Sequence, residues 1–221
     1  MRYALYYAPE PDDPLLEAGN AWLGRDPQTG TAITQPAFSL PAPIQAAHTQ
    51  SARRYGFHAT LKAPFSLRTD EIALRADLAK LAARLRPFTL PALAVTRLDG
   101  FIALCPTQPA PALRCLAARC VIALDAHRAP FSATDFARRS ASLDPRGQLY
   151  LSRYGYPHIF ERFQFHLTLS DAHAPDHLFT AAQRHFAASL SRPHCLTSLA
   201  LFCETEPGAP LRLIHRERLG G

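Results

Sequence analysis

The sequence predicts an α+β protein with two pseudo-symmetric lobes, each an antiparallel sheet backed by helices, and a central cleft between them. Two observations carry this prediction. A strand–helix–strand–strand pattern occurs twice, and the copies are offset by 108 residues. Each copy opens on nearly the same five residues, at 57–61 and 165–169. We therefore expect one bilobal domain over residues 1–221, with an internal repeat around 57–105 and 165–216.

Prolines, of which there are 20, divide the first part of the chain into short elements. The tyrosine-rich run Arg2–Tyr7 predicts a first strand. Residues 15–23 predict a short helix that ends at Gly24. Residues 25–55 show weak periodicity, so we expect a long loop there, with a helix around 44–48.

The first copy of the repeat has clearer signals. Residues 57–63 alternate between apolar and polar side chains, as strand residues do. The residues Thr69-Asp70-Glu71 are expected to cap a helix whose leucines at 74, 78, 81 and 85 form one apolar stripe. Strands are expected at 92–96 and 100–105, joined by a tight turn at Asp99-Gly100.

Two helices are expected between the copies, at 112–126 and 145–154. Asp144 and Gly155 have the residue types that begin and end the second of these helices. The second copy then repeats the pattern of the first. Its expected strand, helix and two further strands lie at 165–170, 176–190, 196–204 and 210–216.

Composition excludes several classes of protein. Hydrophobic residues make up 48% and charged residues 19% of the chain, which is unlike a disordered protein. No apolar run approaches the roughly 20 residues of a membrane-spanning helix, and the first residues do not resemble a signal peptide. We therefore expect a cytoplasmic protein with no membrane partner. The net charge of +6 favours an anionic ligand such as a nucleotide, a sugar phosphate or RNA.

The repeated string Phe-His-x-Thr-Leu is the strongest signal in the sequence. Random order of this composition would give it about 0.005 times per chain, whereas it occurs twice. Alternate strand residues share a face, so His58, Thr60 and Lys62 are expected on one face of the first strand. His166 and Thr168 are expected on the matching face of the second. Two imidazoles and two hydroxyls would then project into one cleft.

The motifs also allow a purely structural role or a zinc site. Polar residues on a solvent-facing strand need not be histidine and threonine at the same two places, which disfavours a purely structural role. Two histidines could also bind zinc, but neither motif contains a carboxylate or cysteine to complete a site. The five cysteines form no Cys-x-x-Cys pair and are expected to be reduced. We therefore expect no metal and no cofactor.

Two His-x-Thr motifs in a duplicated, basic α+β chain resemble the 2H phosphoesterase superfamily. The longer strings at 54–65, 155–157 and 163–169 resemble its branch of phosphonate-metabolism proteins (DUF1045-like). The resemblance implies a 2H phosphoesterase-like fold and a hydrolase, namely a metal-independent cyclic phosphodiesterase. It also implies a small phosphorylated ribose as substrate, with 5-phosphoribosyl 1,2-cyclic phosphate of phosphonate catabolism as the candidate.

The residue types fit that implied chemistry. Imidazoles can donate or accept a proton near neutral pH, so His58 and His166 are the expected general acid and base. Hydroxyl groups can donate hydrogen bonds to phosphate oxygens, which is the role expected of Thr60 and Thr168. The sequence leaves open which histidine is the base.

Basic and aromatic residues near the motifs predict a substrate-binding surface. The candidates are Lys62, Arg54, Tyr55, Arg153 and Tyr154. Tyrosines near strand ends are as often packing residues, and arginines are as often solvated. Two other functions stay open: an RNA-end 2′,3′-cyclic phosphodiesterase or ligase, and a non-catalytic RNA- or nucleotide-binding module. The oligomeric state is not predicted.

Overall fold

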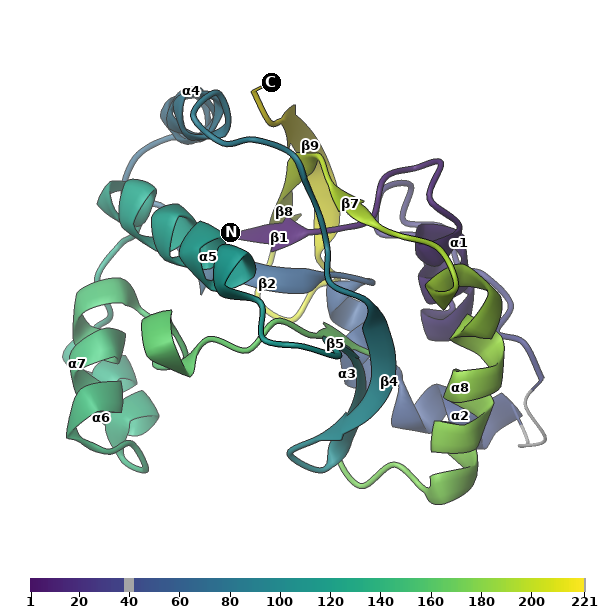
Figure 1. Ribbon diagram of the computed structural model, residues 1–221. Helices are drawn as coiled ribbons and strands as arrows, with labels where there is room; N and C mark the ends of the chain where they lie inside the picture. The colour runs from purple at the N-terminus through teal and green to yellow at the C-terminus, as the bar shows by residue number, and fades with distance from the viewer. Residues whose placement is uncertain (38–41, 221) are drawn as a thin grey trace.

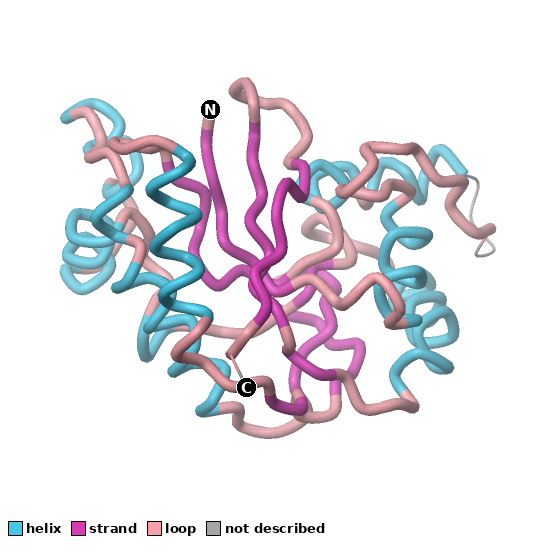
Figure 2. The backbone as a smooth tube through the Cα atoms, turned by 90° about the horizontal axis from the view of Figure 1, so that it is seen from above, coloured by secondary structure: helices cyan, strands magenta, loops and turns pink. Residues whose placement is uncertain are grey.

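A computed structural model describes residues 1–37 and 42–220, in which antiparallel strands run between two groups of helices (Figures 1 and 2). The helices α4 to α7 gather on one side of the molecule, and α1, α2 and α8 on the other. The strands are β1 (Arg2–Tyr7), β2 (Ala59–Phe65), β3 (Phe88–Thr89), β4 (Leu93–Leu98), β5 (Phe101–Pro106), β6 (Leu167–Thr168), β7 (Cys195–Leu196), β8 (Ser198–Glu204) and β9 (Arg212–Arg218). The helices are α1 (Pro14–Leu23), α2 (Ala42–His48), α3 (Gln50–Tyr55), α4 (Glu71–Ala82), α5 (Pro111–Ala123), α6 (Ala133–Ser140), α7 (Pro145–Tyr154) and α8 (Asp176–Leu190), with 3-10 turns η1 (Asp125–His127) and η2 (Phe160–Arg162).

The main sheet brings the two motif strands side by side. Seven strands pair in the order β4-β5-β6-β2-β1-β8-β9, and β3 and β7 form a separate pair. All of these pairs are antiparallel, and Ala59 of β2 lies opposite Leu167 of β6. The α+β class and the antiparallel pairing are therefore confirmed. The expectation of two separate sheets is not met, because the motif strands themselves pair and join the two sets of strands.

Local sequence signals explain where several helices begin and end. The Asp70 carboxylate accepts a hydrogen bond from the Ala73 amide at 2.8 Å at the start of α4. The Asp144 carboxylate accepts one from the Gly147 amide at 2.9 Å at the start of α7. Gly155 ends α7 with a φ of 78°, in the left-handed region that glycine adopts without steric cost.

One face of the sheet is covered by helices. Leu5 of β1 and Leu61 of β2 are buried there against apolar residues of α1, α4, α5 and α8. Trp22 of α1 is also buried, and its indole Nε1 donates a hydrogen bond to the Leu169 carbonyl at 2.7 Å. Burial of each large apolar side chain contributes about 1.5–3 kcal/mol relative to exposure. This face holds the main hydrophobic core.

The opposite face of the sheet carries the motif side chains. Tyr6 and Phe202 form a smaller buried cluster on this face, with Tyr55 packed against it. The His58 ring lies against the Tyr6 ring of this cluster. Thr60 alternates along β2 with core residues of the helix-covered face, so it shares the second face.

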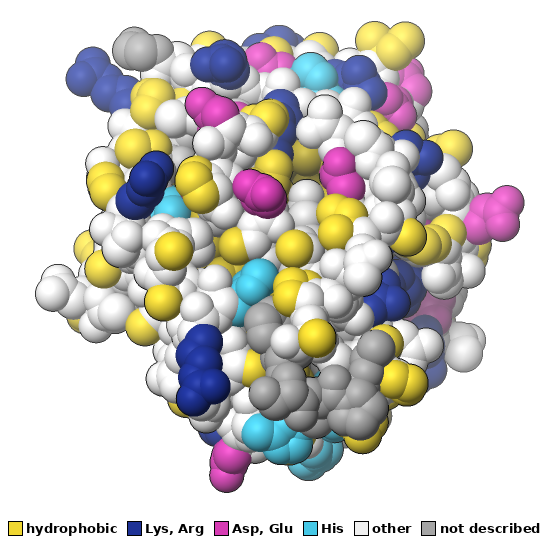
Figure 3. Space-filling view, turned by 90° about the vertical axis from the view of Figure 1, so that its right-hand side faces the viewer, with side chains coloured by type: hydrophobic (Ala, Val, Ile, Leu, Met, Phe, Trp, Pro, Cys, Tyr) yellow, Lys and Arg dark blue, Asp and Glu magenta, His cyan; other side chains and the backbone are white. Residues whose placement is uncertain are grey.

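The surface over α1 and α8 carries no large patch of one charge. Basic, acidic and hydrophobic side chains are interspersed on that face (Figure 3). The positive net charge is therefore not concentrated on the face that Figure 3 shows.

Among the described residues, no helix combines the length and apolarity needed to cross a bilayer.

Candidate functional site

Each motif histidine immediately precedes one of the two central strands. His58 precedes β2 and His166 precedes β6. His58 Nδ1 lies 2.9 Å from the Gly56 carbonyl oxygen, and His166 Nδ1 lies 2.9 Å from the Gln164 carbonyl oxygen. A carbonyl can only accept, so Nδ1–H is the donor in both neutral rings. Both Nε2 atoms are therefore left with a lone pair that can accept a proton.

The backbone before His58 requires a glycine. Gly56 has a φ of 80°, which L side chains rarely adopt. A Cβ atom there would also lie 2.8 Å from the Pro27 Cβ. This turn directs the Gly56 carbonyl back towards Nδ1 of His58 and so fixes the orientation of the imidazole.

Two neighbours hold the His58 ring from other directions. The Tyr6 ring stacks on it, with centroids 3.7 Å apart and an interplanar angle of 23°. The Thr60 hydroxyl lies 3.3 Å from Nε2 and can donate to its lone pair. His166 instead contacts Phe101, with ring centroids 5.6 Å apart. The two imidazoles thus have matching Nδ1 bonds but different surroundings.

Burial keeps both imidazoles neutral at neutral pH. It lowers the pKa of His58 to about 4, against a smaller upward effect of the Gly56 carbonyl and a further lowering by the nearby His166. Burial also lowers the pKa of His166, while the Gln164 carbonyl and the Asp99 carboxylate raise it. Desolvation penalises the charged form of an imidazole, so each free Nε2 is a base rather than an acid.

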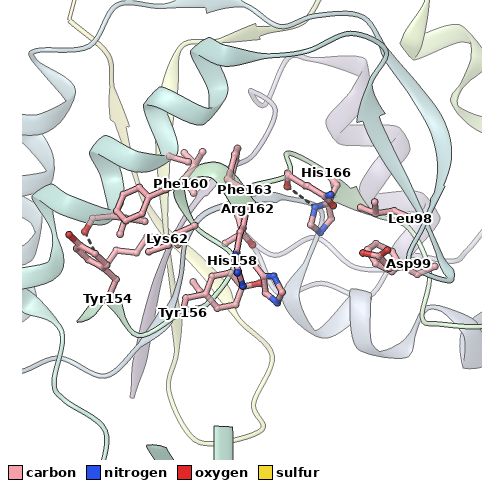
Figure 4. Close-up of a pocket in the computed structure, with 18 residues that line it drawn as sticks. Lys62, Leu98, Asp99, Tyr154, Tyr156, His158, Phe160, Arg162, Phe163 and His166 are labelled. Atoms are coloured by element: carbon pink, nitrogen blue, oxygen red, sulfur yellow. Dashed lines mark hydrogen bonds between the residues drawn. The ribbon is translucent and has the colours of Figure 1, made fainter. Parts of the chain in front are cut away.

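Two adjoining cavities border the four motif residues. The first has a volume of about 480 Å³ and is lined by Thr60 and His166, among others (Figure 4). The second has a volume of about 440 Å³ and is lined by His58, Thr60 and Thr168. Thr60, Phe101 and Tyr156 line both. The motifs therefore border two adjoining cavities, each large enough for a small phosphorylated sugar.

Three of the other predicted binding residues line these cavities. Tyr55 lines the second cavity, and Tyr154 and Lys62 line the first. The Lys62 side chain is only 2% exposed, however, and its ammonium donates to the Val121 carbonyl at 3.2 Å and to the Asp125 carboxylate at 3.3 Å. Lys62 lines the first cavity, but its charge is therefore already paired.

Arg54 and Arg153 do not line either cavity. The Arg54 guanidinium forms an ion pair with Glu204 and donates to the Ala209 carbonyl at 3.3 Å. The Arg153 guanidinium lies over the Tyr154 ring, 6.0 Å from its centroid. The structure therefore does not bring these two arginines to the motifs. For Arg54 the cause is its pairing with Glu204, which the neighbouring sequence does not indicate.

Several residues that line the first cavity were not among the sequence candidates. Asp99 and Phe101 come from the turn and start of the β4–β5 hairpin, and His158 and Arg162 come from the segment before the second motif. A signal existed for the hairpin, because Asp99-Gly100 predicted its turn. Nothing in the sequence indicated that β5 pairs with β6 and so places this turn beside His166.

A metal centre has no support in the described part of the chain. Residues 1–37 and 42–220 contain no group of three or more histidine, cysteine, aspartate or glutamate side chains placed to hold an ion. The chemistry that the site offers is hydrogen bonding to phosphate oxygens by Thr60 and Thr168 and proton exchange at two imidazole Nε2 atoms.

The fold and site thus define an α+β protein with paired His-x-Thr motifs at the centre of an antiparallel sheet. The chain belongs to the family described as "Protein of unknown function (DUF1045)", whose model matches residues 60–212. The DUF1045-like assignment is therefore confirmed.

Two curated relatives carry the name "Ribose 1,5-bisphosphate phosphokinase PhnN". The protein of Janthinobacterium sp. (strain Marseille) is 41% identical, over 95% of this chain and 49% of its own length. That of Laribacter hongkongensis (strain HLHK9) is 39% identical, over 96% of this chain and 50% of its own length. The chain thus spans about half the length of these relatives.

Solved structures with a similar arrangement include E. coli LigT complexed with 3′-AMP. Its TM-score is 0.45 at 16% identity, with 100% of this chain and 99% of that chain covered. A structure described as "Crystal structure of phosphoesterase" has a TM-score of 0.44 at 15% identity, with 100% and 99% covered.

The names of the curated relatives contradict the predicted reaction. The sequence predicted a hydrolase that opens a cyclic phosphate, whereas both relatives are named as phosphokinases. The phosphodiesterase assignment and its RNA-end and non-catalytic alternatives are corrected accordingly. Histidine and threonine side chains can bind phosphate and exchange protons in many kinds of phosphoryl reaction. The residue types alone therefore did not determine the reaction.

Proposed function

We propose that the protein binds a phosphorylated ribose, with ribose 1,5-bisphosphate as the candidate, and that one of its phosphates lies between the two His-x-Thr motifs. The observation that carries the proposal is the matched geometry of His58 and His166 on neighbouring strands beside two cavities. The class of sugar comes from the name of the two relatives.

The four motif side chains would share the phosphate oxygens. Thr60 and Thr168 hydroxyls can donate hydrogen bonds, and an imidazole that takes up a proton becomes a charged donor. A phosphate monoester has a second pKa of about 6, and its negative charge raises the pKa of a nearby imidazole. Binding should therefore be accompanied by proton uptake at one or both Nε2 atoms.

The strand order supports a pseudo-symmetric site. In the sheet, β6 of the second copy lies next to the β4–β5 hairpin of the first copy. On the other side of the β6–β2 pair, β2 of the first copy is followed by β1 and then by the β8–β9 hairpin of the second copy. We infer that the two halves are related by a pseudo-twofold axis near the Ala59–Leu167 pair. A phosphate near that axis would meet one motif from each half.

Both relatives are named as phosphokinases. We propose that this chain takes part in such a phosphoryl transfer. The sequence contains two lysines, Lys62 and Lys80, and neither lies in a Gly-x-x-x-x-Gly-Lys-Ser/Thr segment. That segment is the usual cradle for nucleotide phosphates. We therefore assign to this chain the site for the phosphorylated ribose rather than the site for the phosphoryl donor.

Isothermal titration calorimetry with ribose 1,5-bisphosphate tests this proposal. Wild-type protein should bind it, and His58→Ala and His166→Ala should each weaken binding by about tenfold or more, since each removes a charge-assisted hydrogen bond. His177→Ala is the matched control, because His177 is exposed on α8. Absence of binding by wild type, or unchanged affinity in both motif variants, would overturn the proposal.

A further inference from the structure

A sugar bisphosphate needs a second anion site, and the motifs serve only one phosphate. Among the described residues, one lysine and one arginine line the first cavity, Lys62 and Arg162. Burial lowers the pKa of Lys62 to about 8, so the arginine is the firmer positive charge. The Lys62 ammonium is buried and bonded to the Asp125 carboxylate. Arg162 therefore has to be considered as the cation that receives the second phosphate.

Arg162 is held in place by a carboxylate that is itself anchored. Its two terminal nitrogens donate to the two Asp144 oxygens at 2.7 and 2.5 Å. Asp144 also accepts from the Gly147 amide, so its position is fixed by the start of α7. A guanidinium has five N–H donors. The Asp144 fork uses two of them, which leaves three for another anion.

The surroundings of Arg162 favour an anion at this end of the cavity. Figure 4 shows Arg162 and His158 together between Lys62 and His166, and both line the cavity. Asp99 is the carboxylate that lines the same cavity within the described residues, and it lies at the far end beside His166. Arg162 is paired with Asp144 as Lys62 is with Asp125, but the Arg162 side chain is 30% exposed whereas that of Lys62 is 2% exposed. The donors that a second phosphate can reach therefore lie at Arg162.

We propose that Arg162, with His158 beside it, forms the subsite for the second phosphate of a pentose bisphosphate, and that Asp144 is a positioning residue for Arg162. This inference rests on the proposed function. It assigns this charge to Arg162, whereas the sequence had suggested Lys62, Arg54 or Arg153. Arg162 then determines specificity, because a sugar with one phosphate can occupy the motifs without it.

Calorimetry with ribose 5-phosphate and ribose 1,5-bisphosphate tests the subsite. Wild type should prefer the bisphosphate by about tenfold or more. Arg162→Met should lose about 10- to 100-fold in affinity for the bisphosphate, the loss expected for charge-assisted bonds, and little for the monophosphate. Asp144→Asn retains a side-chain oxygen for the Gly147 amide but releases the arginine, so it should lose part of the preference.

Arg153→Met is the matched control, since Arg153 lies outside both cavities, and it should behave as wild type. Circular dichroism checks that each variant is folded. Equal losses for both sugars in Arg162→Met, no loss for either, or a wild type without preference would overturn the subsite while leaving the motif site intact. Failure of wild type to bind the bisphosphate, or unchanged binding in His58→Ala and His166→Ala, would instead overturn the proposed function.

Discussion

Replacing His58 by phenylalanine should make the protein less sensitive to acid. The native imidazole is partly buried and stacks on the Tyr6 ring, and desolvation lowers its pKa from 6.5 to about 4. In the unfolded chain the same imidazole takes up a proton as the pH falls through 6.5. The unfolded state then binds more protons than the native state, so stability that is present above pH 6.5 is lost on acidification. Phenylalanine can stack on Tyr6 but does not titrate.

The size of this effect follows from the pKa difference. Between about pH 7.5 and about pH 5, the single imidazole should lower the free energy of unfolding by about 2 kcal/mol in wild type. His166 and His185 also have lowered pKa values through burial, but they are present in both proteins. The difference between wild type and His58→Phe therefore isolates the contribution of His58.

Urea denaturation at the two pH values measures this difference. The free energy of unfolding should fall by about 2 kcal/mol more in wild type than in His58→Phe on going to the lower pH. His177→Phe, at an exposed position on α8, should retain the wild-type dependence. An identical pH dependence in wild type and His58→Phe would refute the conclusion that the native imidazole is held neutral.

Three further substitutions probe the site. Gly56→Ala should destabilise the protein by about 1–3 kcal/mol in urea denaturation, since it forces an L side chain to a φ of 80°; wild-type stability would contradict the role of this turn. Lys62→Met should leave the affinity for ribose 1,5-bisphosphate nearly unchanged in calorimetry, because Asp125 retains Arg128 at 2.8 Å and the lysine charge is not available to the sugar; a large loss would show that Lys62 contacts it. Asp99→Asn should lower the pKa of His166 in an NMR titration, since the carboxylate raises it; an unchanged pKa would exclude their interaction.

Much of the local structure could be predicted because its signals are local. The first strand has the predicted bounds Arg2–Tyr7, and Asp144 and Gly155 flank α7 as expected. The helix expected around 44–48 is found as α2 (Ala42–His48). Capping groups, glycines and apolar periodicity act within a few residues of one another, so they can be read from a single sequence.

The pairing of strands could not be predicted in the same way. The second motif was expected on a strand over 165–170, whereas β6 is confined to Leu167–Thr168. Helix α6 (Ala133–Ser140) was not expected, and it has no buried residue that would give it an apolar stripe. The short strand β6 joins the strands of the two copies into one sheet. Its pairing with β2 depends on a contact between Ala59 and Leu167, which are more than 100 positions apart.

The same difference between local and long-range signals applies to the predicted site. The repeat identified both histidines and both threonines, and the structure places all four beside adjoining cavities. The carboxylate partners of Arg54 and Lys62 could not be predicted, because proximity in sequence does not reveal a tertiary partner. Glu204 lies 150 residues from Arg54, and Asp125 lies 63 residues from Lys62. Arg162 does not belong to any motif recognised in the sequence. It became a candidate only because the structure places it in the lining of the first cavity.

The central claim is that the two imidazoles receive one phosphate of a phosphorylated ribose at their Nε2 atoms. Nitrogen-15 NMR of the histidine side chains, with and without ribose 1,5-bisphosphate, tests this claim most directly. In the free protein at neutral pH, both His58 and His166 should be neutral, with the proton on Nδ1. On addition of the sugar, their Nε2 resonances should move towards the protonated range, while that of His177 should not. Unchanged Nε2 resonances of both motif histidines at saturating sugar would contradict the account.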